Sequence, residues 1–233
     1  LFRPLSREQM DIIDCQQFPY FPTFPAKIAA VMKKKPLVIT WHEVWGDYWY
    51  EYLGWMGIFG KTTERLVAGL TPNVIAVSTT TAKKLHHLGV SDQIRIIPNG
   101  VNTSHLRSVP PSTEFFDIIF VGRLIKEKHV DVLVRAFATI LPESPNLKML
   151  VLGDGPEREM IRTIIRNLAI EDRVILEPFL DSHDEVIARM KVSRVFVIPS
   201  TREGFGIAAL EALACGLPVV TVDHPDNAIA ELI

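Results

Sequence analysis

The chain has 233 residues, enough for one large domain or two modest domains that each bury a core. A formal net charge of −2 gives no overall basic field, which argues against nucleic acid as a partner. No apolar run reaches the about 18 residues that a membrane-spanning helix needs. Cys15 and Cys215 follow no metal-binding or redox spacing, so the sequence predicts a reducing, cytoplasmic setting.

The first part of the chain alternates short apolar strands with helices. The pattern predicts strands at 11–14, 37–40, 74–77 and 94–97, and helices at 26–34, 62–70 and 79–88. Three Phe-Pro pairs within 18–25 predict an irregular loop, because proline removes a ladder donor. The polar segment 102–113, with Pro110-Pro111, reads as a domain boundary. The sequence therefore predicts a first domain over residues 1–110.

An aromatic window, residues 41–59, follows the second predicted strand and contains all four tryptophans. With several glycines nearby, this density favours a mobile lining for a bulky acceptor over core packing alone. It also suggests a lipid-linked or glycan acceptor and a peripheral membrane contact, at the inner face. His42 lies at the carboxyl end of that strand, where open α/β sheets bind ligands, although a lone histidine is more often structural.

The second part of the chain alternates more regularly. Strands are predicted at 116–121, 147–152, 173–176, 195–198 and 218–222, and helices at 130–140, 156–168, 184–192 and 206–215. Uninterrupted apolar strands between amphipathic helices indicate a parallel sheet covered on both faces. The fold class is therefore α/β, with two Rossmann-like parallel-sheet domains that face a cleft. The second domain is predicted over residues 111–233.

A glycine-containing turn, Glu203-Gly204-Phe205-Gly206, lies between the strand at 195–198 and the helix that follows it. Backbone N–H groups and the positive end of the helix dipole meet there, which suits a phosphate. Glu211 is the only charged residue between Gly204 and Val222. It either occupies a solvated face or accepts hydrogen bonds from a pair of sugar hydroxyls.

Two further loops leave strand ends in the second domain. Gly122-Arg123 and Lys128 follow the strand at 116–121, and a planar guanidinium with an ammonium suits a diphosphate, although cations in loops are usually only solvated. The segment Gly153-Asp154-Gly155-Pro156 follows the next strand, and we expect it to line the same diphosphate pocket. It is not a dinucleotide fingerprint, because Arg158 replaces the third glycine. The absence of a P-loop and of an Asp-x-Asp pair predicts neither NTP hydrolysis nor a carboxylate-held metal.

These motifs resemble, in order and spacing, the donor domain of glycosyltransferase family 4. The resemblance covers 116–233 and rests on Val121-Gly122-Arg123-Leu124, Glu127-Lys128, Gly153–Pro156, Glu203–Gly206 with Glu211, and Cys215–Val220. Thr40–Glu43 and Ile97–Val101 resemble the acceptor domain of that family more loosely. The resemblance implies a GT-B fold and a retaining, metal-independent transfer from a nucleotide-diphosphate-sugar to a glycan, lipid-linked or small-molecule acceptor, with no further cofactor.

Carried over by position, the resemblance implies a role for each site residue. Arg123 and Lys128 neutralise the leaving diphosphate, Glu203 faces the donor sugar, and Glu211 binds the ribose. His42 approaches the reacting sugar, and Phe179 and Leu180 border the base. The implied catalytic residues are His42, Arg123, Lys128 and Glu203, and the implied donor-binding residues are Gly122, Arg123, Lys128, Gly153, Asp154, Phe179, Leu180, Glu203, Gly204, Phe205, Gly206 and Glu211.

Two residues depart from the family pattern. His129 stands where a glycine usually follows the lysine, and we expect it to crowd the phosphate turn. Asn102 replaces a more usual aspartate, with no assignable role. Family members also begin with an earlier strand and a glycine-rich loop and continue beyond the second domain. We therefore expect a fragment with an incomplete first domain that is inactive alone; sugar transfer by the purified chain would refute this.

Other functions fit the same scaffold. A nucleotide-sugar epimerase, a phosphorylase or a non-catalytic nucleotide-sugar-binding module would share the fold. The set of Arg123, Lys128, Glu203 and Glu211 argues against a purely non-catalytic module. The failed glycine fingerprint disfavours a nicotinamide oxidoreductase.

Overall fold

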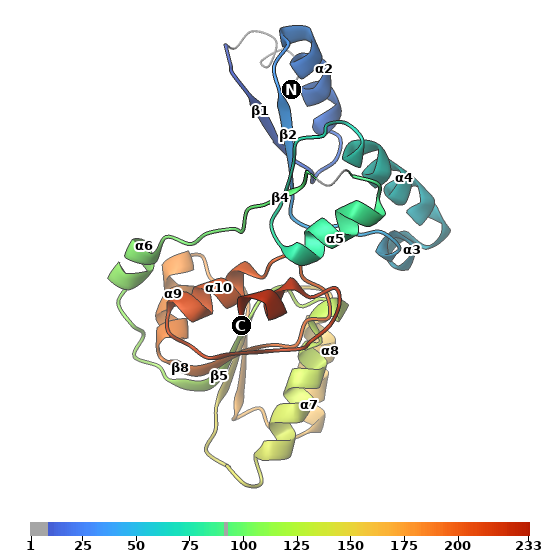
Figure 1. Ribbon diagram of the computed structural model, residues 1–233. Coiled ribbons are helices and arrows are strands. Elements are labelled where there is room, and N and C mark those ends of the chain that lie inside the picture. Colours follow the sequence, from blue (N-terminus) through green and yellow to red (C-terminus); the bar gives the residue numbers. More distant parts are fainter. Residues whose placement is uncertain (1–8, 91–92) are drawn as a thin grey trace. The chain divides into compact units, whose positions relative to one another are not determined.

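The computed structural model describes residues 9–90 and 93–233, which form two compact units (Figure 1). The first unit ends at Asn99 and the second begins at Gly100, before the boundary predicted after Pro110. The segment predicted as a domain boundary, 102–113, contains helix α6 (Thr103–Ser108), and Leu106 and Val109 are buried in the core of the second unit. Asn102 caps this helix, because its side chain accepts a hydrogen bond from the His105 amide at 3.0 Å.

The first unit contains a four-stranded parallel sheet in the order β1-β2-β3-β4. The strands are β1 (Ile13–Gln16), β2 (Leu37–Trp41), β3 (Val74–Ala76) and β4 (Arg95–Ile96). The helices are α2 (Thr23–Lys33), α3 (Tyr48–Leu53), the short 3₁₀ helix η1 (Gly54–Met56), α4 (Gly57–Ala68) and α5 (Thr79–His87). The predicted alternation of strands and helices is therefore present, with shifted boundaries.

The core of the first unit lies on one face of this sheet. Along β2, Ile39 and Trp41 are fully buried, whereas Val38 and Thr40 on the opposite face are only partly buried. Side chains from α2, α4 and α5 pack in the same cluster as Ile39 and Trp41. The two-residue alternation of burial follows from the pleat of a strand.

The aromatic window is largely helical, and its role as a lining for an acceptor stays a prediction. Residues 48–68 form α3, η1 and α4 in succession, and Trp49 is buried. A Cβ atom on Gly60 would lie 2.3 Å from the Trp49 ring, so this glycine provides the space into which the indole packs. Trp55, in contrast, is 78% exposed. The window is thus divided between core packing and exposed aromatic surface.

Helix α2 begins earlier than predicted, at Thr23, and includes Pro25 in its first turn. Proline is tolerated there because the first N–H groups of a helix have no intrahelical acceptor. The predicted irregular loop therefore ends at Pro22.

The second unit contains a five-stranded parallel sheet in the order β7-β6-β5-β8-β9. The strands are β5 (Phe116–Val121), β6 (Met149–Leu152), β7 (Val174–Glu177), β8 (Ser193–Ile198) and β9 (Val219–Thr221). The helices are η2 (Lys126–Lys128), α7 (Val130–Ile140), α8 (Arg158–Asn167), α9 (His183–Lys191), α10 (Ile207–Ala214) and η3 (Ala228–Leu232). Figure 1 shows α7 and α8 on one face and α9 and α10 on the other, as predicted.

The central strands of the second unit explain why its sequence pattern is continuous. All four residues of β6 are fully buried, as are Phe116 and Phe120 of β5 and Phe196 of β8. A strand covered by helices on both faces has no polar side, so it reads as an unbroken apolar run.

Candidate active site

The strand order of the second sheet brings three predicted loops, those after β5, β6 and β8, to one edge of the sheet. The chain proceeds outward from β5 to β6 and β7, then returns so that β8 pairs with β5 on its other side. The loops after β5 and β8 therefore flank the point where the strand order reverses. In open α/β sheets, ligands bind outside the carboxyl ends of the strands at this point.

Lys128 and Glu203 form an ion pair between these two loops. Their side chains are only 13% and 15% exposed, so the pair is largely shielded from water. The buried Ser200 hydroxyl also donates to Glu203 Oε1 at 3.3 Å. The structure thus joins two residues that the sequence placed 75 positions apart.

A second set of contacts joins the same loops. The Thr201 amide donates to the Glu127 carbonyl at 3.1 Å, and His129 Nε2 lies 2.8 Å from Thr201 Oγ1. His129 adopts a left-handed backbone conformation with φ of 48°. The imidazole thus bonds to the neighbouring loop, and the expectation that it crowds the phosphate turn stays a prediction.

The turn at 203–206 is held from behind by the segment that follows β9. The Glu203 amide donates to the Asp226 carbonyl, and the Ala228 amide donates to the Glu203 carbonyl, both at 2.9 Å. Asn227 is buried, and its side-chain Nδ2 donates to the Val222 carbonyl at 2.7 Å. Sequence reasoning missed these supporting residues, because one polar segment near the end of the chain carries no motif.

Helix α10 begins directly after Gly206, as the motif predicted. Gly206 has a φ of +89°, and a Cβ atom there would lie 2.3 Å from Ile229 Cγ1. Only glycine fits a position with both constraints. Phe205, which the resemblance includes among the donor-binding residues, is 7% exposed, so its side chain belongs to the packed underside of the turn.

The loops after β5 and β6 approach each other closely. The Gly122 amide donates to the Leu152 carbonyl, and the Leu124 amide donates to the Asp154 carbonyl. Gly153 has a φ of +157°, and a Cβ atom there would lie 1.8 Å from the Gly122 carbonyl oxygen. The close approach therefore requires glycine at position 153.

Replacing Gly153 by alanine is expected to lower the free energy of unfolding of the second unit by at least about 1–3 kcal/mol, because the methyl group overlaps backbone atoms that cannot rotate away. Urea unfolding followed by far-UV circular dichroism measures the loss. Gly100→Ala is the control, since nothing lies within 4 Å of its added Cβ. Equal midpoints for the two variants would contradict the assignment.

Glu211, inside α10, has a partner that the sequence did not indicate. Its Oε1 atom lies 3.0 Å from His183 Nε2, at the start of α9. The Glu211 side chain is 13% exposed, whereas that of His183 is 57% exposed. This carboxylate is therefore mostly buried and partnered, rather than part of a solvated face. Phe179, 51% exposed, and the partly buried Leu180 precede α9 in the same loop.

Arg123 occupies the loop after β5 with an exposed side chain. Its carbonyl accepts a hydrogen bond from the Ile125 amide at 3.1 Å. Within residues 9–90 and 93–233, no ion pair engages its guanidinium. The guanidinium can therefore receive an external anion.

In the first unit, His42 lies just after β2 and is held by two glutamines from the end of β1. Its Nε2 lies 2.5 Å from Gln16 Oε1, and its amide donates to Gln17 Oε1 at 3.0 Å. Because an amide oxygen only accepts, the neutral ring carries its proton on Nε2 and leaves Nδ1 as an acceptor. Partial burial lowers the pKa of His42, and the Asp14 carboxylate opposes this shift.

We expect the imidazole of His42 to titrate below its usual value of about 6.5. Asp14→Asn should lower the pKa further, because it removes the charge that favours the protonated ring. Because the pKa of His42 is lower in the folded chain, the unfolded chain binds this proton more readily than the folded chain. The contribution of His42 to the free energy of unfolding therefore falls as the pH drops below about 6.5. NMR titration of the histidine ring protons measures both pKa values. A pKa that rises in the Asp14→Asn variant would contradict the electrostatic cause.

Comparison with known proteins decides the family. Residues 102–231 match the family described as Glycosyl transferases group 1, and residues 1–105 match Glycosyltransferase Family 4. The first match covers more than half of the 233-residue chain. The chain belongs to the group 1 glycosyltransferases. The predicted resemblance is confirmed.

Several curated relatives of this glycosyltransferase chain are enzymes with different named products. The N-acetyl-alpha-D-glucosaminyl L-malate synthase of Bacillus anthracis is 40% identical over 103 residues, which are 44% of this chain and 26% of that protein. A D-inositol 3-phosphate glycosyltransferase of Acidothermus cellulolyticus is 33% identical over 147 residues, 55% of this chain and 33% of that protein. The alpha-monoglucosyldiacylglycerol synthase of Streptococcus pneumoniae is 27% identical over 209 residues, 82% and 47% respectively. The chain spans less than half the length of each of these relatives.

Solved glycosyltransferase structures share the fold. HepE of Anabaena, solved with UDP and glucose, has a TM-score of 0.76 and 22% identity, and the match covers 96% of this chain and 61% of that one. Sucrose-phosphate synthase of Thermosynechococcus elongatus has a TM-score of 0.72 and 22% identity, with 95% and 58% covered. The predicted GT-B fold class is confirmed.

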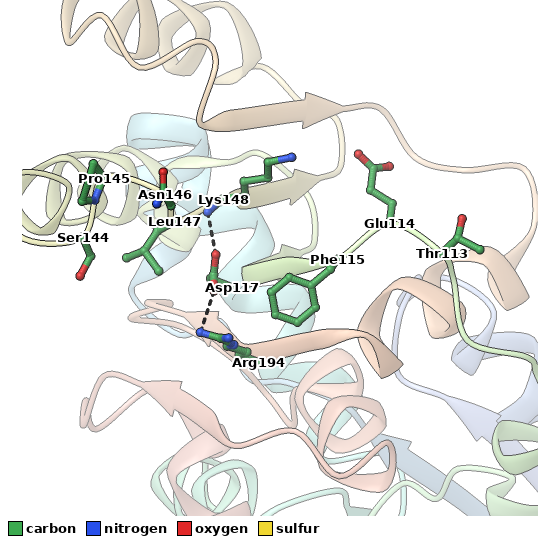
Figure 2. A pocket seen from close by; sticks show the side chains of 10 residues that line it. All are labelled: Thr113, Glu114, Phe115, Asp117, Ser144, Pro145, Asn146, Leu147, Lys148 and Arg194. Carbon is green, nitrogen blue, oxygen red and sulfur yellow. Dashed lines mark hydrogen bonds and ion pairs between the residues drawn. The ribbon is translucent and has the colours of Figure 1, made fainter.

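The second unit of the glycosyltransferase also has a pocket of about 720 Å³, away from these loops (Figure 2). It is lined by Phe115 just before β5, Asp117 near the beginning of β5, and Lys148 just before β6. Asp117 accepts a hydrogen bond from the Lys148 amide at 2.9 Å and pairs with Arg194 at 3.2 Å (Figure 2). Because the strands are parallel, this pocket lies at their amino ends, opposite the edge that carries Lys128 and Glu203.

The sequence predicts no metal site, and the side chains that could bind a metal ion can be compared with that prediction. Over residues 9–90 and 93–233, no group of three or more His, Cys, Asp or Glu side chains is arranged to hold a metal ion. Metal independence and the absence of a cofactor stay predictions.

Proposed function

We propose that the second unit binds a nucleoside diphosphate sugar and that the chain belongs to an enzyme that transfers this sugar to an acceptor. The proposal rests on the shielded Lys128–Glu203 pair at the point where the strand order reverses. HepE was solved with UDP-glucose as well as with UDP and glucose, which supports a nucleoside diphosphate as the first ligand class to test.

The ion pair between Lys128 and Glu203 suits both the diphosphate and the sugar of the donor. An ammonium group has three N–H donors, so Lys128 can bond Glu203 and a phosphate oxygen at the same time. The cation also offsets the negative charge of Glu203, which would otherwise repel the diphosphate. Glu203 then remains available to the sugar hydroxyls, and Arg123 can supply a second cation from the same loop.

We propose a retaining, metal-independent reaction. The bond between the anomeric carbon and the diphosphate oxygen breaks, and the electron pair leaves with the diphosphate. Fixed cations and the N–H groups at the beginning of α10 stabilise the growing negative charge. The acceptor hydroxyl attacks from the face that the diphosphate leaves, and its proton passes to a diphosphate oxygen. In this proposal, Glu211 holds the ribose and His42 serves the acceptor side.

Thermal unfolding with a panel of nucleotide sugars tests donor binding. UDP-glucose, UDP-N-acetylglucosamine and GDP-mannose are each added to the chain at increasing concentration. A true donor at 100 times its Kd stabilises the bound protein by about 2.7 kcal/mol and raises the melting temperature. Glu211→Ala should abolish that rise, whereas Glu185→Ala, at an exposed position of α9, should preserve it. No rise with any nucleotide sugar would overturn the proposal.

Product analysis separates the transferase from the other functions. Label that moves from the nucleotide sugar to a new acceptor indicates a transferase, and isomerised nucleotide sugar indicates an epimerase. Dependence on inorganic phosphate indicates a phosphorylase, and binding without turnover indicates a non-catalytic module. The anomeric configuration of the product and the rate in the presence of EDTA test retention and metal independence.

A second proposal concerns the acceptor, which we infer to be lipid-linked and reached by peripheral contact with a lipid surface. Exposed aromatic side chains gather on α3, η1 and α4, with Tyr52 62%, Trp55 78% and Phe59 63% exposed. Lys61 and Arg65 lie on the same helix as Phe59. Aromatic residues with flanking cations are typical of helices that lie in a membrane interface.

Two further observations frame this lipid contact. Among helices in the described part of the chain, none combines the length and apolar character needed to cross a bilayer. One relative, by its name, makes a glycolipid, the alpha-monoglucosyldiacylglycerol synthase of Streptococcus pneumoniae.

Replacing Trp55 and Phe59 together by serine is expected to weaken binding to vesicles of anionic phospholipid about 10-fold or more, since each side chain loses an apolar burial of about 1.5–3 kcal/mol. Co-sedimentation with vesicles measures the affinity. Val132→Ser, an exposed position on α7 of the other unit, is the control. Undiminished binding by the double variant would contradict the lipid contact.

A further inference from the structure

We propose that His129 is a positioning residue of the diphosphate site, where it fastens the loop after β5 to the loop after β8 through Thr201. The inference rests on the proposed function, because it assigns a role in binding the diphosphate. It assigns no contact between His129 and substrate.

The backbone at His129 is unusual for a residue with a side chain. Among residues 9–90 and 93–233, the other non-glycine residues with positive φ are Lys34 and Ala169, which follow the ends of α2 and α8. Left-handed residues are common at such helix ends. His129, with φ of 48° and ψ of 41°, likewise follows the end of a helix, the short η2, and it also precedes the first residue of α7. A side chain in this conformation is strained relative to glycine.

The contacts of His129 provide a reason for that strain. His129 Nε2 lies 2.8 Å from Thr201 Oγ1, in a partly buried position. The Thr201 amide donates to the Glu127 carbonyl at 3.1 Å, so side-chain and backbone bonds join the same two loops. His129 directly follows Lys128, and Thr201 lies two positions before Glu203. The bond between His129 and Thr201 therefore lies beside the ion pair that the diphosphate would meet.

The strain and the bond predict opposite effects when His129 becomes glycine. Glycine accepts the left-handed conformation without strain, so the folded state should not become less stable. It cannot reach Thr201, so the two loops lose a fixed connection and Lys128 is less well held. A residue retained only for folding would show the reverse: lower stability without a specific loss of affinity.

The test measures the affinity of the chain for UDP by calorimetry, together with its melting temperature. We expect His129→Gly to bind UDP about 5-fold more weakly, as for the loss of one hydrogen bond, with an unchanged or higher melting temperature. Thr201→Val should show a similar loss of affinity, and the double variant should bind no more weakly than either single variant. Thr201→Ser, which keeps the hydroxyl, should bind UDP like the parent chain.

The outcomes separate this inference from the proposed function. If the parent chain binds UDP and the His129→Gly and Thr201→Val variants bind it equally well, the positioning role is wrong and the donor site stands. Additive losses in the double variant would also overturn the bond as their shared cause. If the parent chain binds neither UDP nor GDP, the proposed function fails and this inference fails with it.

Discussion

In the full-length enzyme, replacing Lys128 by methionine should reduce sugar transfer about 100-fold or more and weaken UDP binding about 10-fold or more. Removing one group that stabilises the charge of a leaving group typically has an effect of this size on the rate. A hydrogen bond to a charged phosphate accounts for the loss of affinity. Lys126→Met is the matched control, since Lys126 is an exposed residue of the same short helix, η2.

Part of the Lys128→Met effect should come from Glu203. Without its cation, this carboxylate, which is 15% exposed, places an uncompensated negative charge beside the diphosphate. The Lys128→Met, Glu203→Gln double variant should therefore bind UDP more tightly than Lys128→Met alone. A Lys128→Met variant with parental UDP affinity and rate would remove the ion pair from the site.

The second large effect is expected at Glu64, a residue that no sequence motif singled out. Its side chain is fully buried in α4 and accepts hydrogen bonds from the Trp45 and Gly46 amides, both at 2.8 Å, and from the Tyr20 hydroxyl at 2.9 Å. One carboxylate thus ties the loop after β2 and the segment before α2 to helix α4. Removing the carboxylate would break all three of these hydrogen bonds.

Glu64→Ala is expected to lower the free energy of unfolding of the first unit by about 3–5 kcal/mol, because breaking buried hydrogen bonds to a charged group is costly. Urea unfolding followed by tryptophan fluorescence suits this measurement, since all four tryptophans lie in the first unit. Glu64→Gln keeps one acceptor oxygen and should give an intermediate loss. Thr62→Ala, at an exposed position of the same helix, is the control. A loss below about 1 kcal/mol would show that the loops are held by other contacts.

The second unit was largely predictable because its elements depend on local patterns. The strand at 116–121 and the helix at 130–140 were predicted with the bounds that the structure gives, β5 and α7. Both carry strong periodic signals: an unbroken apolar run and an amphipathic helix. In the first unit, α3 was missed and α4 was placed too late, because aromatic residues gave no helical period. Trp49 of α3 packs against Gly60 of α4, a contact between two elements that a local pattern does not record.

The candidate site was predicted in part. The sequence placed Lys128 and the turn at 203–206 at strand ends, and the structure brings them together. It did not indicate His183 beside Glu211, Thr201 beside His129, or the support that Asp226 and Asn227 give to the turn. The roles of the site residues in binding and transfer stay predictions, which the variants above test.

The alternation of strands and helices, the family, and the loops that leave the carboxyl ends of strands could all be predicted from local patterns. These features follow from hydrophobic periods and motifs that a few neighbouring residues carry. Which loops meet depends on the folded arrangement of the whole unit. His129 and Thr201 are 72 positions apart, and their contact depends on β8 returning to pair with β5. The order of strands in a sheet is set by packing over the whole unit, so no local pattern records it.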